Sequence, residues 1–251
     1  MKLAISQPTY LPWIGYLDLV DQVDTFVLLD DVQFEKQSWQ QRNRIKTPTG
    51  LQWLTVPVLF RGRFGQLINE VEIRDIQFWR THLRAIELNY RRAPFFADYF
   101  DELTFQIVPS ASPALIADLD VGLLEWFMDV LGIQTRLLRS SQLKQPGKRT
   151  ELLANICASL GATEYVSPIG SADYLLQEMG VLFGKGIDLV FQHYEHPQYR
   201  QLFPPFCPYA SILDLIFNEG ERALEILRSG RRTPLLAEEV TERISTQVLA
   251  G

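Results

Sequence analysis

The stretch AISQPTYLPWIGYLDLV (residues 4–20) decides the fold, because it joins a short apolar strand to a helix through a connection of unusual composition. With the apolar run that follows, it predicts a strand over residues 2–6, a helix over 14–22 and a strand over 25–29. Such a βαβ unit forms a parallel pair of strands, and ligands bind at the carboxyl ends of strands in sheets of this kind. A purely structural turn needs only a glycine or an Asn/Asp pair, whereas this one contains two prolines, two tyrosines, a tryptophan and a glycine. The turn therefore predicts one wall of a small-molecule site.

The rest of the chain extends this pattern. Residues 48–50 (PTG) separate two strand-like runs and predict a β-hairpin, while QLINEVEI (residues 66–73) alternates as a further strand would. Helical periodicity predicts three helices between residues 75 and 131. Beyond residue 132 we expect strands over 135–138, 164–167 and 189–193, helices over 150–160 and 172–179, and two short amphipathic helices after residue 212.

These elements predict a Rossmann-like α/β fold. A mostly parallel sheet would carry an inserted β-hairpin and a helical segment. We expect a single domain over residues 1–251, made of a βαβ unit plus hairpin (1–74), the helical segment (75–131) and a C-terminal α/β half (132–251).

The composition and charge of the chain exclude some classes of function. The formal net charge of −6 and the pI near 5.2 argue against nucleic acid as a partner, since phosphate contacts need clustered Lys and Arg. Cys157 and Cys207 are isolated, so we expect two small buried hydrophobes and a reducing compartment. The N-terminal apolar run is interrupted by Gln7 and Pro8 and is too short to span a membrane. A cytoplasmic protein with a small-molecule substrate is the expectation.

The densest polar stretch is DDVQFEKQSWQQRNRIK (residues 30–46). Asp30 and Asp31 follow a strand, where a carboxylate pair can act as a general base, bind a divalent metal or orient a sugar hydroxyl. Arg42 and Arg44 can clamp a phosphate or carboxylate. The alternative is a solvated loop in which Asp30 caps and the arginines line a hairpin strand. Phe34 and Trp39 favour a ligand role, because aromatic side chains are costly to expose in a mobile loop unless they pack or stack on something.

Two further stretches contain candidate site residues. In SPIGSADYL, Ser167, Gly170 and Ser171 follow a strand and can present hydroxyls and amides to a phosphate, with Ser171 as a plain N-cap as the alternative. In HYEHPQYRQ, His193 and His196 suit proton transfer better than metal ligation, because an HxxH pair on a strand and its exit loop does not converge. A histidine satisfied by a backbone carbonyl is the alternative for both, and we expect it for His82.

Several of these stretches carry a family resemblance. QPTYLPWIGY, LDDVQFEKQSWQQRNRIK, YVSPIGSADYL and HYEHPQYRQLF with SILDLIFNEG occur in this order, and together they resemble the WbqC-like family. This resemblance covers nearly the whole chain. It implies a place among the proteins of bacterial surface-polysaccharide gene clusters, whose proposed activities include glycine or aminoacyl transfer to O-antigen sugars.

A second similarity concerns the N-terminal turn. PTYLPWIGYLDLV followed by FVLLDDVQF is similar in spacing to the opening of HUP-type nucleotidyl enzymes such as the pantothenate synthetases. This similarity implies a HUP-type variant of the Rossmann-like fold. Trp13 and Tyr16 stand where the two histidines of the HxGH signature would be, and Gly15 stands at its glycine. Indole and phenol are neutral donors at pH 7, so nucleotide binding would survive this change better than adenylyl transfer.

The expected function is therefore a transferase of surface-polysaccharide biosynthesis that forms an amide between an amino acid and a sugar or nucleotide-sugar. A non-catalytic nucleotide- or sugar-binding protein and an assembly partner for polysaccharide-biosynthesis enzymes are the alternatives. ATP or a nucleotide-sugar is the expected small molecule. Whether a divalent metal is also bound is left as an alternative. The expected catalytic residues are Asp31, His193 and His196, and the expected substrate-binding residues are Gln7, Tyr10, Trp13, Gly15, Tyr16, Asp30, Gln33, Lys36, Trp39, Arg42, Asn43, Arg44, Ser167, Gly170 and Ser171.

Overall fold

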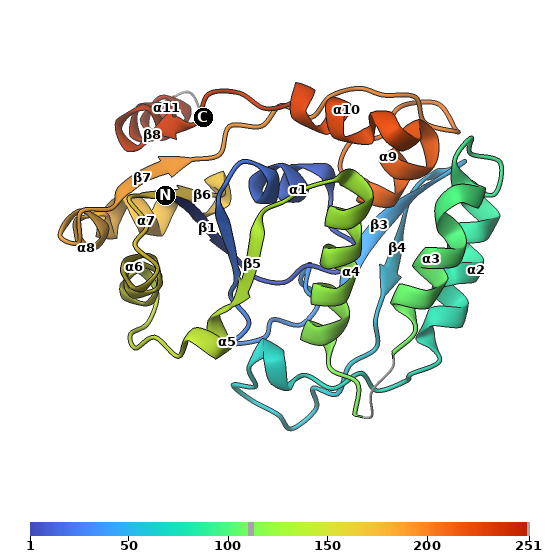
Figure 1. The fold of residues 1–251 in the computed structure, drawn as a ribbon, viewed down its shortest axis with the longest axis horizontal. Helices are drawn as coiled ribbons and strands as arrows, with labels where there is room; N and C mark the ends of the chain where they lie inside the picture. The colour runs from blue at the N-terminus through green and yellow to red at the C-terminus, as the bar shows by residue number, and fades with distance from the viewer. Residues whose placement is uncertain (110–112, 250–251) are drawn as a thin grey trace.

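The computed structural model describes residues 1–109 and 113–249, without the side chains of 244–249. A six-stranded sheet in the order β5-β2-β1-β6-β7-β8 forms its centre (Figure 1). Five of these strands are parallel and β8 is antiparallel to β7, which confirms the predicted α/β fold with a mostly parallel sheet. The strands are β1 (Lys2–Ser6), β2 (Thr25–Leu28), β5 (Arg136–Arg139), β6 (Glu164–Ser167), β7 (Asp188–Phe191) and β8 (Leu235–Leu236).

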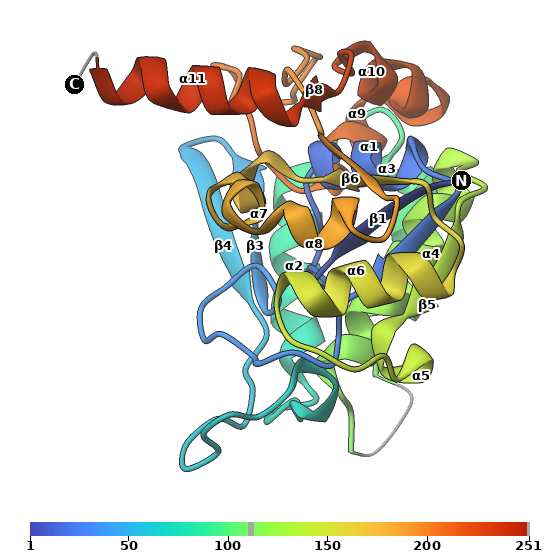
Figure 2. The same ribbon diagram turned by 90° about the vertical axis from the view of Figure 1, so that its left-hand side faces the viewer.

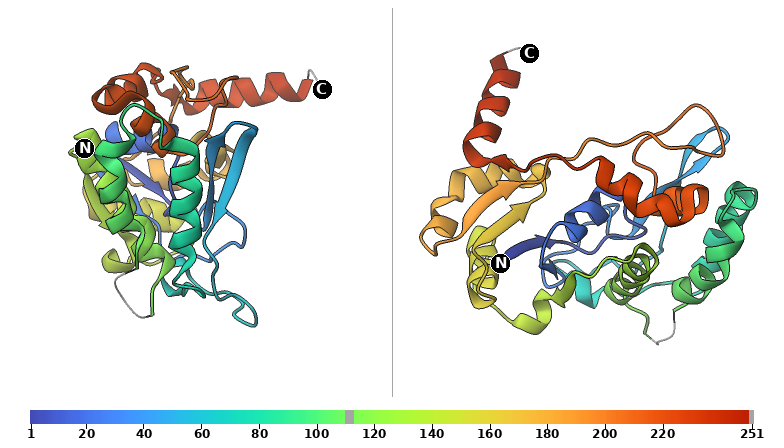
Figure 3. Two further views of the ribbon diagram at one scale, coloured as in Figure 1. Left: turned by 90° about the vertical axis from the view of Figure 1, so that its right-hand side faces the viewer. Right: turned by 45° about the horizontal axis from the view of Figure 1, so that its top comes forward.

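Helices cover both faces of this sheet. Figure 2 shows α6, α7 and α8 on one side of the sheet. The left panel of Figure 3 faces the other side and shows the green helices, of which α4 lies next to the sheet while α2 and α3 pack beyond it, against the hairpin and α4. The helices are α1 (Ile14–Asp21), α2 (Phe78–Tyr90), α3 (Phe96–Ile107), α4 (Ile116–Leu131), α5 (Ser140–Leu143), α6 (Thr150–Ser159), α7 (Ala172–Glu178), α8 (Gly180–Phe183), α9 (Ile212–Glu219), α10 (Ala223–Ser229) and α11 (Ala237–Leu249). None in the described ranges is long and apolar enough to cross a bilayer.

The alternation of side chains along the strands divides the interior into two cores. Ala4 and Phe26 pack on one face of the sheet with α1, α4 and α9. Leu3 and Val27 pack on the other face with α6, α7 and α8. Because both faces are buried, the parallel strands are apolar throughout their central residues, which is typical of sheets covered by crossover helices.

A separate two-stranded sheet lies outside the parallel sheet. β3 (Arg42–Thr47) and β4 (Gly50–Thr55) pair antiparallel, with Arg44 opposite Trp53. Gly50 has a φ of 123°, a conformation that favours glycine at the turn. This hairpin and the three helices α2 to α4 agree with the predictions from the sequence.

Two predictions about elements were wrong. Residues 66–73 form a 3-10 turn (Ile68–Glu70) instead of a strand, because the Glu70 backbone N–H donates to the Leu67 carbonyl and the Leu67 N–H donates back to the Glu70 carboxylate at 3.0 Å. The segment after residue 212 contains β8 and α11 besides the two expected helices. Leu235 and Val240 are buried, and β8 pairs with β7, so this end of the chain covers the side of β7 that would otherwise be an open sheet edge.

Candidate functional site

A cavity of about 580 Å³ opens at the carboxyl ends of β1 and β6. From β1 the strand order runs to β2 and β5 on one side and to β6 and β7 on the other, so the cavity lies at the topological switch point. Ligands of open α/β sheets bind at this position. We call it the switch-point cavity; it is lined by Ile5, Ser6, Gln7, Pro8, Thr9, Trp13, Tyr16, Leu29, Glu35, Ser38, Trp39, Gln40, Asn43, Arg44, Leu153, Tyr165, Pro168, Ser171, Tyr174 and Tyr209.

The turn after β1 forms one wall of the cavity. Trp13 and Tyr16 line it, and the Tyr16 hydroxyl donates to the Gln7 carbonyl at 2.9 Å. Tyr10 points into the protein instead, where its hydroxyl lies 2.7 Å from Nδ1 of buried His82. Burial lowers the pKa of His82 to about 4, so this imidazole is neutral and structural.

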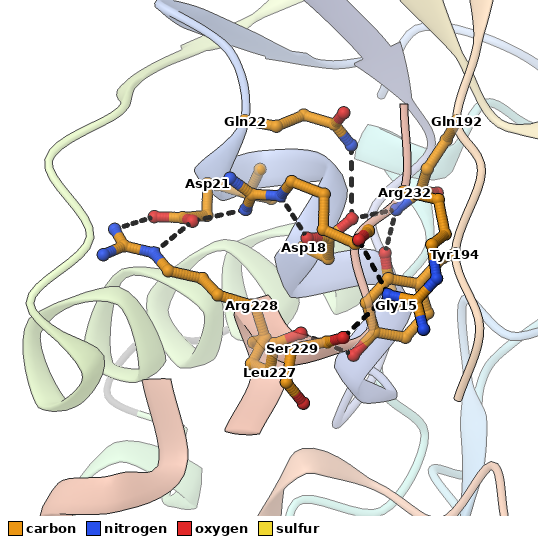
Figure 4. A network of polar contacts seen from close by, with 12 residues as sticks. Gly15, Asp18, Asp21, Gln22, Gln192, Tyr194, Leu227, Arg228, Ser229 and Arg232 are labelled. Atoms are coloured by element: carbon orange, nitrogen blue, oxygen red, sulfur yellow. Dashed lines mark hydrogen bonds and ion pairs between the residues drawn. The ribbon is translucent and has the colours of Figure 1, made fainter. Parts of the chain in front are cut away.

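Gly15 is required by the position of the Trp13 indole. A Cβ atom at Gly15 would lie 2.1 Å from the Trp13 ring, so only glycine lets the indole lie against the first turn of α1. The Gly15 carbonyl accepts a hydrogen bond of 2.8 Å from Gln192 Nε2, which also donates to Asp18 (Figure 4). Gly15 therefore shapes the wall from outside the lining.

His196 supports the same wall from behind. Its ring stacks on Trp13 with an interplanar angle of 14° and packs edge-on against Tyr209. Nε2 accepts from the Tyr209 backbone N–H at 3.1 Å, so Nδ1 carries the proton and donates to the Pro197 carbonyl at 2.9 Å. Burial lowers the pKa of His196, in agreement with this neutral tautomer.

The carboxylate pair at the end of β2 lies outside the cavity lining. Asp30 is fully buried and accepts hydrogen bonds from Arg139 Nε (2.6 Å) and from the Ser141 backbone N–H (3.0 Å). Asp31 accepts from the Ser140 hydroxyl. The two side chains thus fasten β2 to the start of α5.

Residues 33–44 form the opposite wall. Trp39, Asn43 and Arg44 line the cavity, and Asn43 is held by a bond of 3.1 Å from its Nδ2 to the Tyr10 carbonyl. Lys36 and Arg42 lie outside the lining, over the rings of Phe60 and Trp53 respectively. Gln33 forms an isolated bridge with Leu67.

Comparison with known proteins places this arrangement in a family. The WbqC-like protein family matches residues 7–226, which contain the β1 turn, the hairpin and every lining residue beyond Ile5 and Ser6. The chain belongs to the WbqC-like protein family. The uncharacterized protein Rv1507c of Mycobacterium tuberculosis is 41% identical over 232 residues, which span 92% of this chain and 99% of that protein. No solved structure matches.

In this WbqC-like chain the segment after β6 closes the cavity. Ser171 lines it, whereas Gly170 does not and the buried Ser167 hydroxyl donates to the Pro168 carbonyl at 3.2 Å. Ser171 is the N-cap residue of α7, but its side chain makes no capping hydrogen bond. His193 also lies outside the lining. Its backbone carbonyl accepts a hydrogen bond from the Arg232 backbone N–H.

Sequence reasoning missed several lining residues of this WbqC-like site. Glu35, Ser38 and Gln40 lie inside the polar stretch that was singled out, and Tyr174 lies inside SPIGSADYL. Gln40 Nε2 donates to Gln7 Oε1 at 2.8 Å and so joins the two walls.

Of the two cysteines, Cys157 is buried as expected but Cys207 is only half-buried. Over the described residues, no group of three or more His, Cys, Asp and Glu side chains could hold a metal ion.

Proposed function

We propose that the chain is a transferase of bacterial surface-polysaccharide biosynthesis and that the switch-point cavity holds a sugar or nucleotide-linked sugar. Membership of the WbqC-like family, with its link to surface-polysaccharide gene clusters, supports the proposal at the level of the family. The cavity itself is the observation that carries it, since about 580 Å³ lies within the range of small-molecule sites.

The lining suits a ligand with both rings and polar groups. Trp13, Tyr16 and Trp39 offer aromatic faces to a base or sugar ring. Arg44 adds a guanidinium that can hold a phosphate or carboxylate in a bidentate manner. The helix-covered sheet supplies a rigid floor, because Ile5 and Tyr165 are buried strand residues.

The proposed reaction is aminoacyl transfer that forms an amide. An amine on the sugar attacks the carbonyl of an activated aminoacyl donor, the C–N bond forms, and the bond from that carbonyl to the leaving group breaks. Glu35 is the carboxylate in the lining and would take the proton that the amine loses. Asp31, His193 and His196 remain predicted acid–base groups, but none of them lines the cavity.

A non-catalytic binding protein is the second candidate. Two observations favour it. Both ring nitrogens of His196 make structural hydrogen bonds, and the Asp30 carboxylate does as well. Such a protein would bind the same ligand without turnover, so binding and catalysis must be measured separately.

The first experiment is a thermal-unfolding screen with ATP, CTP, UDP-sugars, dTDP-sugars and free amino acids. A ligand at a hundred times its Kd stabilises the native state by about 2.7 kcal/mol, which raises the Tm. We expect a nucleotide-linked sugar to raise it, and we expect Arg44→Ala to remove the shift. Arg84→Ala is the matched control, because Arg84 is exposed on α2 and outside the lining.

Turnover is then tested with the ligand that binds. An amine-bearing form of that sugar and an aminoacyl donor should give the amide by mass spectrometry, and Glu35→Gln should lower the rate by about 10²–10⁴-fold with the Tm shift retained. Binding without product supports the second candidate. A shift that survives Arg44→Ala, or no shift with any nucleotide-linked sugar, contradicts the proposed site.

A further inference from the structure

The outer face of the hairpin next to the cavity carries an unusual set of side chains. Side chains alternate along its strands, so Asn43 and Leu54 are buried on the inner face while Arg44 and Trp53 share the outer one. We define the hairpin platform as Trp39, Arg42, Arg44 and Trp53.

The two tryptophans of the platform are exposed. Trp39 and Trp53 keep 49% and 42% of their surface in solvent, although large apolar side chains on one surface are costly unless they bind something. Their ring centroids lie 5.4 Å apart and the planes are inclined by 36°. The pair therefore forms an open, angled surface instead of a closed slot.

Both arginines lie against these rings without an anionic partner. The guanidinium carbon of Arg42 is 4.3 Å from the Trp53 ring centroid, and that of Arg44 is 5.3 Å from the same centroid. Their Nε atoms are buried and make no hydrogen bond within the described chain, and neither guanidinium forms an ion pair there. In a chain of net charge −6, two unpaired guanidinium groups held in place by aromatic rings indicate a site for an anion.

The platform continues directly from the cavity. Trp39 and Arg44 belong to the cavity lining as well, while Arg42 and Trp53 extend the surface outward. A ligand part that leaves the cavity at this wall would therefore lie on the platform.

We propose that the hairpin platform binds an acidic sugar, a pyranose that bears a carboxylate, and that this ring belongs to the acceptor saccharide; this assignment rests on the proposed function. One face of a pyranose presents C–H groups of partial positive charge, which pack on the negative face of an indole. A carboxylate on the rim of the ring reaches sideways, where the planar guanidinium fork matches its two oxygens.

The open geometry favours a sugar over a nucleobase. A base gains most from two parallel faces, but these indoles are inclined and exposed. Successive rings of a saccharide change direction at every linkage and fit an angled surface. The amine-bearing part of the same acceptor then lies in the cavity beside the platform.

Trigalacturonate and its neutral counterpart, trigalactose, are the probes, and calorimetric titration of the full chain is the measurement. We expect trigalacturonate to bind at least tenfold more tightly than trigalactose. Trp53→Ala and Arg42→Gln should each weaken trigalacturonate binding at least tenfold. Arg42→Lys keeps the charge but loses the planar guanidinium, so its affinity for trigalacturonate should lie between those of Arg42→Gln and the wild type. Trp79 and Arg80 provide the matched control, because they form another Arg–Trp contact outside the cavity (5.2 Å) and Arg80→Gln should change nothing.

The outcomes separate this inference from the proposed function. Equal affinity for both trisaccharides, no binding of trigalacturonate, or binding unaffected by Trp53→Ala and Arg42→Gln in variants of unchanged Tm overturns the platform. A nucleotide-linked sugar that still raises the Tm of these variants leaves the proposed function intact. If no nucleotide-linked sugar binds while trigalacturonate binds as expected, the proposed function fails and the platform stands.

Discussion

At the scale of the residue, Asp120 is the side chain least expected from its surroundings. It is 1% exposed on α4, and neither carboxyl oxygen makes a hydrogen bond with the described residues. Burial raises its pKa well above the usual range, so the carboxyl is neutral where other aspartates are charged. Burial also raises the pKa values of Tyr10 and Tyr16.

We expect Asp120→Asn to stabilise the protein in a manner that depends on pH. The folded pKa exceeds the unfolded one, so the wild type loses stability as the pH rises from about 4 toward the folded value, and the asparagine variant does not. The variant should match the wild type near pH 4 and exceed it at higher pH by a margin that grows by about 1.4 kcal/mol per pH unit until the pH reaches the folded pKa. Urea unfolding across this range measures the difference.

Asp118→Asn is the control for Asp120. Asp118 lies on the same helix but is 54% exposed and pairs with Arg139. Its loss should change stability by about 1 kcal/mol or less. Parallel stability curves for the wild type and Asp120→Asn would show that Asp120 is not held neutral.

At the scale of the element, the segment between β7 and α9 depends on buried polar anchors. His196 holds the Tyr209 backbone, and Asp214 accepts hydrogen bonds of 2.8 Å from the Tyr199 hydroxyl and from Gln201 Nε2. Burial raises the pKa of Asp214 to about 6. The loop that presents Tyr209 to the cavity is therefore fastened at both a histidine and a carboxyl.

We expect His196→Ala to release this loop. It removes two hydrogen bonds and the stack on Trp13, which should lower stability by about 1–2 kcal/mol at pH 7.5. Since the folded pKa is lowered, the contribution of His196 falls as the pH drops below about 6.5, so the gap to the wild type should narrow on acidification. Hydrogen exchange of the Tyr209 amide reports the loosening locally.

Asp214 also titrates in this pH region and His82 titrates just below it, so the comparison uses the difference between variant and wild type. The His82 pKa of about 4 and the Asp214 pKa of about 6 act on both proteins alike. A gap that is constant between pH 5 and 7.5 would contradict the role of the neutral imidazole.

At the scale of the whole molecule, one ion network ties α1 to the last turn of α10 and to the residues just after it. Asp18 and Asp21 on α1 are 0% and 4% exposed and pair with Arg231 and Arg228. Figure 4 shows Asp18, Asp21 and Arg228 from close by. These partners are separated by 207 to 213 residues, so the network joins the N-terminal βαβ unit to the C-terminal segment.

Arg231→Met should destabilise the protein far more than Arg228→Met. Removing Arg231 leaves the buried Asp18 without its cation, which costs about 3 kcal/mol. Arg228 is 51% exposed, and its loss should cost about 1 kcal/mol or less because Arg231 still faces Asp21. Thermal unfolding of the two variants gives the comparison, and equal losses would place the stabilising contact at the surface pair.

The sequence was sufficient for elements whose periodicity and turn residues agreed. The strand over 164–167 and the hairpin around residues 48–50 followed from local patterns, whereas 66–73 failed because a Glu70 side-chain bond outweighed its alternation. For the candidate site, the polar stretch and the β1 turn were found, but the partners of Asp30 were not. Ser140 and Ser141 lie about 110 residues away, and no local pattern reveals a pairing at that separation.

The tryptophans in and beside the cavity also allow ligand binding to be followed by intrinsic fluorescence. Of the five tryptophans, Trp13 and Trp39 line the cavity and Trp53 packs against Trp39. An indole emits at shorter wavelength when a ligand displaces the water around it, so occupation of the cavity or of the hairpin should move the intrinsic fluorescence without any label. Replacing Trp13, Trp39 or Trp53 one at a time by Phe would then indicate which wall a given ligand touches.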